Sequence, residues 1–243
     1  MPMKPETKKR LKITAISVLA LLLLAVGAFY IYTLNYYRAD EAAVQAMAGE
    51  ENSVVSKDKM WIFYPEKQQA SDTALIFYPG GKVEAAAYAP LLEQLSQQGI
   101  TCVLLKMPFN LAVFDIHAAD RVFEQLPEVK RWYIGGHSLG GAMASSYADK
   151  NGSRLEGMIL LGAYPVGPTE LPTLAIYGSK DMILDTSKLG ATPNQHVIEG
   201  GNHAYFGNYG EQDGDGKAAI TREEQQRQTV EEIIAFILEE EKR

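Results

Sequence analysis

Cysteine is nearly absent from this sequence. Cys102 is the only one among 243 residues, so the chain cannot form an intramolecular disulfide or a metal site built from several thiolates. Cys102 lies within the apolar run 100–105, where we expect a buried and unreactive thiol. Glycine and proline, at 21 and 11 residues, are too few for a collagenous or low-complexity chain. With 47% hydrophobic residues, the chain can instead fold around an apolar core.

Positive charge is scarce beyond the first twelve residues. The chain has 23 Lys and Arg against 30 Asp and Glu, a net charge of −7. Residues 1–12 are themselves basic, so the remainder is more acidic than this total. An acidic surface repels phosphate backbones and gains nothing from counterion release, so we expect no nucleic-acid partner.

Residues 13–34 lie in the longest run without a charge. As an α-helix this run would span roughly 33 Å, enough to cross a hydrocarbon layer of ~30 Å. Basic residues precede it and acidic residues follow it, so the positive-inside bias places the N-terminus in the cytoplasm and the rest outside. We therefore expect a cytoplasmic basic tail at 1–12, a transmembrane signal-anchor at 13–34 in the lipid bilayer, a partly helical tether at 35–51 and an extracytoplasmic domain at 52–243.

A cleaved signal peptide is the alternative interpretation of this segment. Val26-Gly27-Ala28 has the small residues that a signal peptidase recognises, and cleavage there would release a secreted domain. Because the apolar run continues well past Ala28, the anchored form is favoured.

Apolar strands alternate with amphipathic helices after residue 53. This pattern predicts an α/β domain with a mostly parallel sheet covered by helices on both faces. An antiparallel hairpin at 54–64 would form one edge. The other expected strands are 74–78, 101–105, 132–135, 158–161, 174–177 and 196–198, and the expected helices are 84–98, 115–126, 139–149 and 221–240.

Residues 136–140 match the pattern G-x-S-x-G between an apolar strand and a run of helix formers. Glycines on both sides of Ser138 allow a sharp strand-to-helix turn that exposes the serine hydroxyl. The helix N-terminus that follows favours developing negative charge. Ser138 is therefore the candidate nucleophile, with His137 expected to pack behind the turn.

A serine hydroxyl needs a base, and the base needs an orienting carboxylate. Of the two histidines downstream, His196 lies in a strand, whereas His203 lies in a glycine-rich loop just past it, so we assign His203 as the base. Asp181 follows the strand 174–177 and is the expected acid, with Asp185 as the fallback.

An oxyanion hole is the third requirement of this chemistry. The backbone N–H of Leu139, directly after the nucleophile, supplies one donor. The second is expected from the loop after strand 74–78, where Gly81 or Lys82 would donate.

These four motifs, at 78–82, 136–140, 178–181 and 201–203, resemble those of the α/β-hydrolase superfamily. The resemblance covers about residues 54–238 and is strongest to small, lidless members similar to dienelactone hydrolases. It implies Ser138 as nucleophile, Asp181 as acid and His203 as base. Dienelactone hydrolases use a cysteine nucleophile, so the serine here argues for ordinary ester hydrolysis instead. Only about a dozen residues separate strands 158–161 and 174–177, which leaves no room for a lid domain there.

Residues 213–216 have the sequence that begins some calcium loops, but Lys217 stands where a third ligand is needed, so we expect no metal site and no cofactor. The sequence thus predicts a membrane-anchored serine hydrolase, a carboxylesterase acting on a small or envelope-attached ester. Two alternatives remain: an amidase, peptidase or acyltransferase acting on cell-envelope material, and a catalytically silent binding module.

Overall fold

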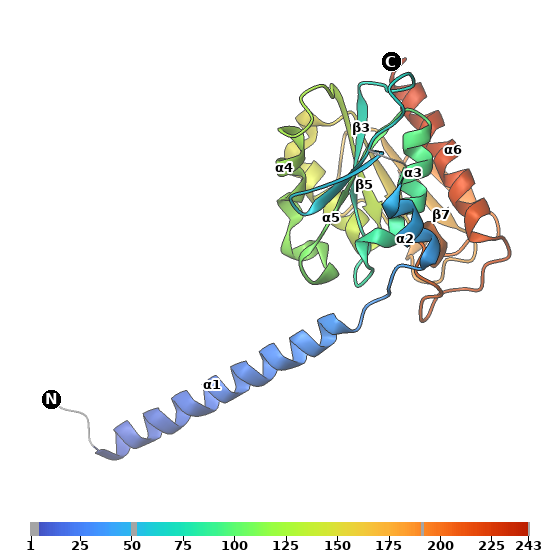
Figure 1. Cartoon of the computed structure of the whole chain (residues 1–243). Coiled ribbons are helices and arrows are strands. Elements are labelled where there is room, and N and C mark those ends of the chain that lie inside the picture. The colour runs from blue at the N-terminus through green and yellow to red at the C-terminus, as the bar shows by residue number, and fades with distance from the viewer. Residues whose placement is uncertain (1–4, 50–52, 191, 243) are drawn as a thin grey trace. The chain divides into compact units, whose positions relative to one another are not determined.

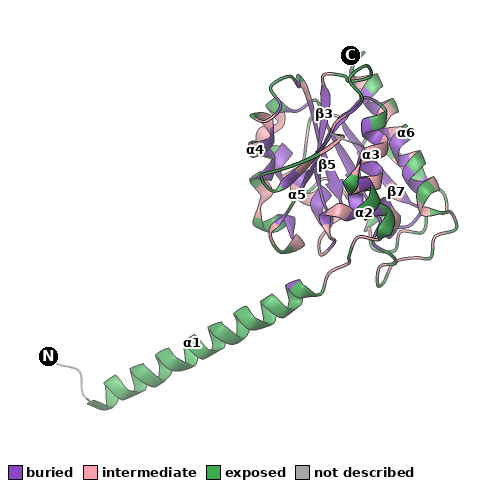
Figure 2. Cartoon of the chain, viewed as in Figure 1, coloured by how far each residue is buried: buried purple, intermediate pink, exposed green. Residues whose placement is uncertain are grey.

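The computed structural model describes residues 5–49, 53–190 and 192–242 and divides into two units, Met1–Tyr36 and Tyr37–Arg243. Helix α1 (Pro5–Leu34) makes up nearly all of the first unit (Figure 1). It contains the predicted run 13–34 and has the length and composition of a membrane span. Its apolar side chains are exposed along its length, so they do not form a protein core (Figure 2).

The second unit is built on one eight-stranded sheet with the order β1-β2-β4-β3-β5-β6-β7-β8. Strands β1 and β2 form the expected antiparallel hairpin, and β2 is also antiparallel to β4, whereas all other neighbours are parallel. The strands are β1 (Val54–Lys57), β2 (Met60–Phe63), β3 (Thr73–Tyr78), β4 (Thr101–Leu105), β5 (Arg131–His137), β6 (Gly157–Leu161), β7 (Thr173–Gly178) and β8 (Asn194–Ile198). The predicted α/β fold is confirmed.

Helices cover both faces of the sheet (Figure 1). Alternate residues of each strand enter two separate apolar clusters, as the period of a strand requires. One cluster lies under α2, α3 and α6, and the other lies under α4 and α5. The remaining α-helices are α2 (Glu41–Ala48), α3 (Ala89–Gln97), α4 (Asp120–Phe123), α5 (Leu139–Asn151) and α6 (Arg222–Glu240). Short 3₁₀ turns are η1 (Ala85–Tyr88), η2 (Pro108–Asn110), η3 (Ala112–Phe114), η4 (Ile116–Ala119), η5 (Gly152–Arg154), η6 (Thr186–Leu189) and η7 (Ala204–Phe206).

The helix expected at 115–126 is wrong in extent. The structure has the 3₁₀ turn η4 followed by the single turn α4. The buried hydroxyl of Tyr78 explains the irregularity, because it donates to Ile116 O at 2.7 Å and accepts from Ala119 N at 3.0 Å. A regular α-helix would use these backbone groups internally.

Residues 37–48, which fall in the segment expected to be a tether, pack onto the second unit. Tyr37 pairs with Val83 in a parallel bridge, and Asp40 both caps α2 and forms an ion pair with Arg222 at 3.2 Å. Ala43 is completely buried in this helix, which lies against α3. The compact unit therefore begins at Tyr37, fifteen residues before the expected boundary at residue 52.

We predict that a fragment starting at residue 37 is more stable than one starting at residue 52. Losing α2 uncovers apolar surface on α3 and breaks the Asp40–Arg222 pair, a loss of about 3 kcal/mol. For a domain of this size the shorter fragment should then melt roughly 6–12 °C lower. Thermal unfolding of both fragments by circular dichroism measures this. Equal melting temperatures would show that the segment contributes nothing to the fold.

Candidate active site

The carboxyl ends of the parallel strands carry the candidate functional residues. Ser138 directly follows β5, Asp181 follows β7 and His203 follows β8. Because parallel strands end at one edge of the sheet, these three residues meet there although they are far apart in sequence. We refer to this side of the second unit as the catalytic edge.

The turn between β5 and α5 holds Ser138 in a conformation that few residues adopt. Its φ and ψ are 52° and −122°, a strained region of the kind that persists where the surroundings enforce it. Glycine is required nearby because a Cβ on Gly140 would lie 2.2 Å from Tyr78 O. A Cβ on Gly136 would lie 2.5 Å from the same atom. The strand end and the helix start thus approach β3 closely, and Ser138 remains partly exposed at the tip.

His203 and Asp181 form a buried pair. The imidazole Nδ1 lies 2.8 Å from Asp181 Oδ2, and the two side chains are 1% and 0% exposed. The other carboxylate oxygen accepts from the backbone N–H groups of Ile183 and Leu184, each at 2.9 Å. The carboxylate is therefore fully hydrogen-bonded and fixed, and it orients the ring so that Nε2 is the nitrogen left for chemistry.

His203 Nε2 is buried and accepts or donates no hydrogen bond within the described part of the chain. The residue His203 lines an open cavity of about 370 Å³ together with Ser138. The other residues around this cavity are Leu139, Ala142, Gly162, Ala163, Tyr164, Ile183, Leu184, Asp185 and Lys188. An imidazole with its second nitrogen directed at a serine-lined cavity can act as a general base there.

Two side chains hold the loops that carry the pair. Asp215 accepts from Ala204 N at 2.9 Å and from Met182 N at 3.3 Å, so one carboxylate joins the loop after β7 to the loop after β8. Gln225 of α6 is fully buried and exchanges two hydrogen bonds with the backbone of Asn202. The loop position of His203 is thereby fixed from both sides.

The fallback acid lines the cavity but does not contact His203, and the second histidine lies outside it. Asp185 caps η6 through Ser187 and its side chain is half exposed. His196 forms an ion pair with Glu232 of α6 at 3.3 Å. Neither is brought to His203, so the structure places Asp181 and not Asp185 beside the imidazole.

The backbone N–H groups of Gly81 and Lys82, the two candidates for the second oxyanion donor, differ in their hydrogen bonds. Lys82 N–H donates to Asn110 O at 2.8 Å, and Gly80 N–H donates to Tyr88 Oη at 3.0 Å. Gly81 N–H has no acceptor within the residues that the structure describes. A Cβ on Gly81 would meet the Leu139 side chain at 2.7 Å, which shows how close this loop lies to the start of α5.

His137 and Tyr88 form a buried polar contact directly behind the turn, as expected for His137. The Tyr88 hydroxyl accepts from Gly80 N–H and forms a second hydrogen bond with His137 Nδ1, 2.8 Å away. Burial raises the pKa of Tyr88, which keeps its hydroxyl protonated. Burial, together with the nearby His203, holds the pKa of His137 well below its usual value. The rings of His137 and His203 lie 4.5 Å apart, so a neutral His137 avoids charge repulsion with His203.

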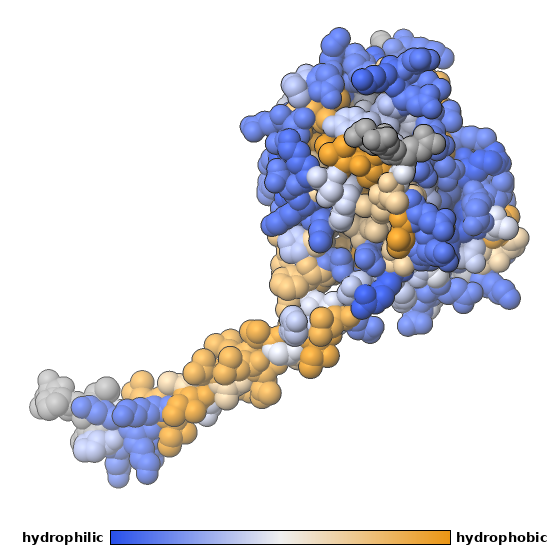
Figure 3. Space-filling model, viewed as in Figure 1, coloured by the Kyte–Doolittle hydropathy of each residue, from blue (hydrophilic) through white to orange (hydrophobic). Residues whose placement is uncertain are grey.

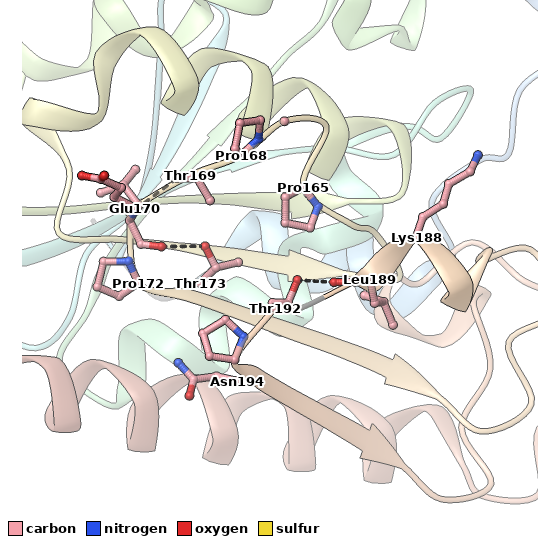
Figure 4. Close-up of a pocket in the computed structure, with 13 residues that line it drawn as sticks. Pro165, Pro168, Thr169, Glu170, Pro172, Thr173, Lys188, Leu189, Thr192 and Asn194 are labelled. Atoms are coloured by element: carbon pink, nitrogen blue, oxygen red, sulfur yellow. Dashed lines mark hydrogen bonds between the residues drawn. The ribbon is translucent and has the colours of Figure 1, made fainter.

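No group of three or more His, Cys, Asp or Glu side chains that could hold a metal ion occurs among residues 5–49, 53–190 and 192–242. A larger hollow of about 520 Å³ lies between the loop after β6 and the segment after η6, and it shares Lys188 with the cavity beside Ser138 (Figure 4). Prolines and uncharged side chains line most of it, as the close-up shows, and it holds neither Ser138 nor His203.

Sequence reasoning did not identify Gly162, Tyr88 or Asp215 as parts of the site. Gly162 has φ +52°, and a Cβ there would lie 2.9 Å from His203 Nδ1 and 3.2 Å from Asp181 Oδ2. Its place directly after β6 was the available signal, since a glycine at a strand end often allows a close approach. Tyr88 gave no local signal, because it acts on residues 8 and 49 positions away.

Comparison with known proteins agrees with this geometry. The family described as alpha/beta hydrolase matches residues 74–227. No curated protein matches the sequence. Among solved structures, Est1E from Butyrivibrio proteoclasticus is 14% identical with a TM-score of 0.55, covering 76% of this chain and 98% of that chain.

Two further solved structures have a similar fold. A dienelactone hydrolase candidate from Klebsiella pneumoniae is 15% identical with a TM-score of 0.53, covering 73% of this chain and 91% of that one. A bacterial membrane phospholipase A is 16% identical with a TM-score of 0.53, covering 95% of this chain and 99% of that one. At these identities the similarity is one of fold.

We predict that Tyr88→Phe destabilises the domain. The substitution leaves two buried groups, Gly80 N–H and His137 Nδ1, without a partner, at a cost of about 1–3 kcal/mol. Tyr147→Phe is the matched control, because that hydroxyl bonds the half-exposed Asp120, which water can serve instead. Urea unfolding of both variants measures the difference. A smaller loss for Tyr88→Phe than for Tyr147→Phe would contradict the prediction.

The depressed pKa of His137 predicts a loss of stability in mild acid. Below about pH 6.5 the unfolded chain protonates this histidine and the folded chain does not, so the unfolding free energy falls with decreasing pH. The contribution approaches about 1.4 kcal/mol per pH unit below that point. His137→Gln, which cannot titrate, should lose this part of the slope between pH 6.5 and 5. Parallel slopes for variant and parent would show that His137 protonates equally in both states.

Proposed function

Because the chain belongs to the alpha/beta hydrolase family, we propose that it is a serine hydrolase that cleaves carboxylic esters at Ser138. The observation that carries this proposal is the buried Asp181–His203 pair: His203 lines the same cavity as Ser138, and its second ring nitrogen makes no hydrogen bond within the described residues. A binding module without catalysis has no need of a buried, oriented imidazole with one nitrogen left open, and such groups are costly to maintain.

The proposed reaction has two halves. His203 Nε2 takes the hydroxyl proton as Ser138 Oγ attacks the ester carbonyl carbon, and Asp181 stabilises the imidazolium that forms. The tetrahedral intermediate then breaks its bond to the alcohol oxygen, which leaves with the proton from His203. Water attacks the resulting acyl-enzyme by the same route, releasing the carboxylic acid and restoring the serine.

We assign the oxyanion hole to the N–H groups of Leu139 and Gly81. Leu139 is the first residue of α5, so its N–H has no acceptor within the helix. Of the two residues open from the sequence, Lys82 already donates to Asn110, which leaves Gly81 as the available donor. Two preorganised donors of this kind stabilise the developing oxyanion by several kcal/mol, at about 3 kcal/mol each.

We propose an ester as substrate because of the shape and volume of the cavity beside Ser138. The cavity is open and of modest volume, which suits a small ester or one exposed on a larger molecule. The similarity in fold to Est1E and to a membrane phospholipase A is consistent with acyl transfer to water. We therefore place a carboxylesterase ahead of an amidase or acyltransferase.

We also propose that α1 anchors the enzyme in a membrane with the catalytic unit outside the cytoplasm. The helix has the required length and composition, and the basic residues lie before its apolar run. In this arrangement residues 1–12 remain cytoplasmic and residues 13–34 cross the bilayer. The folded unit from Tyr37 onward faces the envelope.

A fluorophosphonate probe tests the activated serine directly. We expect the full-length chain in detergent to gain one adduct, detected by intact mass, and to lose it in Ser138→Ala and His203→Ala. Asp181→Asn should lower ester hydrolysis about 10³–10⁴-fold, since the imidazole loses its orienting partner.

Asp185→Asn is the matched control, because this carboxylate lies near the cavity but bonds Ser187 rather than His203. It should retain activity within about threefold of the parent. An unlabelled parent with a normal thermal transition would refute the serine-hydrolase proposal. An equal loss in the two aspartate variants would refute the assignment of Asp181.

A further inference from the structure

Large apolar side chains gather on the surface of the catalytic edge. We call the following set the apolar rim: Phe109, Val113, Phe114, Val166, Met182 and Ile183. Each is between 40% and 73% exposed. Elsewhere in the described part of the second unit, the exposed large apolar side chains are Val44, Val55, Val197 and Leu238, on four separate elements.

The rim comes from three loops that surround the proposed nucleophile. Residues 109–114 follow β4, Val166 follows β6, and Met182 and Ile183 follow β7. All three strands are parallel to β5, so their following loops lie on the same edge as Ser138. The two phenylalanines contact each other edge to face, with ring centroids 5.8 Å apart. Figure 3 shows pale apolar surface at the lower left of the domain, beside hydrophilic surface along the rest of that edge.

Exposing large apolar side chains to water is unfavourable in free energy. The surroundings hold Phe109 at φ 54°, which is unusual for a residue with a bulky side chain, and half of that side chain is exposed. A cluster of exposed apolar groups on one edge of a soluble unit marks a surface that meets an apolar partner. The remaining question is which partner this edge meets.

The point at which the chain enters the second unit identifies the partner. Tyr37 N–H donates to Lys82 O at 2.7 Å, and Glu84 N–H donates to Tyr37 O at 2.8 Å, so the first residue of the unit is fixed to the loop after β3 that contains Gly81. Only Asn35 and Tyr36 separate it from the end of α1, a helix able to span a bilayer. Three peptide links advance at most about 11 Å. The membrane segment therefore joins the domain at the catalytic edge.

We propose that the apolar rim inserts into the surface of the bilayer in which α1 is anchored. Ser138 then opens onto the interface between lipid and water, and the substrates are esters that reside there rather than esters free in solution. Phenylalanine and aliphatic side chains enter the boundary between headgroups and acyl chains to a depth of roughly 5–10 Å, which matches loops that project from one edge. The substrate class rests on the proposed function, whereas the insertion of the rim does not.

A fluorescent probe on the rim tests the insertion without reference to activity. Cys102 is fully buried and burial raises the pKa of its thiol, so a single new cysteine can be labelled selectively in the full-length chain. Val113→Cys reports on the rim, and Leu238→Cys is the matched control at the opposite edge. Leu238 lies near the end of α6, where Glu241 contacts Thr73 at the start of β3. Both proteins are reconstituted in phosphatidylcholine vesicles with and without nitroxide-labelled phosphatidylcholine.

We expect quenching at position 113 to exceed that at position 238 about threefold or more, since nitroxide lipids quench only fluorophores at membrane depth. Equal and weak quenching at both positions would overturn the proposal. In vesicles without nitroxide, a fluorescence at position 113 that falls as the protein-to-lipid ratio rises would also overturn the proposal. It would show that a second copy of the chain covers the rim. The thermal transition of each labelled protein shows whether it is folded. If Val113→Cys is misfolded, Phe114→Cys replaces it as the rim position.

Rates of hydrolysis of a vesicle-borne ester and of a water-soluble ester test the substrate class separately from the proposed serine hydrolase activity. The double variant Val113→Ser/Phe114→Ser should hydrolyse an ester dissolved in vesicles about tenfold more slowly than the parent, given the apolar area removed from the rim. Its rate on a short water-soluble ester should be unchanged, as should both rates of the control Val55→Ser/Leu238→Ser. Equal rates of double variant and parent on the vesicle-borne ester would refute the substrate class. A parent inactive on both esters would refute the proposed function, while the quenching result would still decide the insertion.

Discussion

The close approach of the β5–α5 turn to the end of β3 is the constraint on which the rest of this site depends. Gly136 and Gly140 leave no room for a Cβ against Tyr78 O, so strand, turn and helix must meet at a fixed separation. That separation holds Ser138 at positive φ. It also brings the start of α5 against Gly81, so the candidate nucleophile and both candidate oxyanion donors follow from one packing contact.

A second constraint is that the rings of His137 and His203 lie 4.5 Å apart, so both cannot be cationic without repelling each other. His203 is oriented by its hydrogen bond to Asp181, whereas burial and the nearby His203 hold the pKa of His137 well below its usual value. A cationic His137 would oppose the imidazolium that the proposed general-base role requires on His203. The Tyr88 hydroxyl also accepts from Gly80, so the loop after β3 and His137 share one buried polar network.

Local sequence signals predicted the sheet, the sharp turn and the pairing of Asp181 with His203. They succeeded because glycine patterns and strand ends act over a few residues, and because parallel strands gather their loops at one edge. The sequence could not predict contacts that join distant segments. Tyr78 interrupts the helix expected at 115–126 from about forty residues away, and Arg222 fixes Asp40 across 182 positions. A propensity pattern contains neither partner, so it predicted neither the packing of residues 37–48 nor the hydrogen bond from Lys82 N–H to Asn110 O.

The absence of a lid domain between β6 and β7 gains a physical meaning from the apolar rim. Only residues 162–172 connect these strands, and Val166 projects from that short loop into solvent. Enzymes that exclude water during acyl transfer usually cover the site with their own chain. Here the chain offers apolar loops around an open cavity and fixes its own entry point, Tyr37, to the loop after β3. A bilayer surface at that edge would supply the cover that the fold omits, and would deliver ester substrates to Ser138 along two dimensions instead of three.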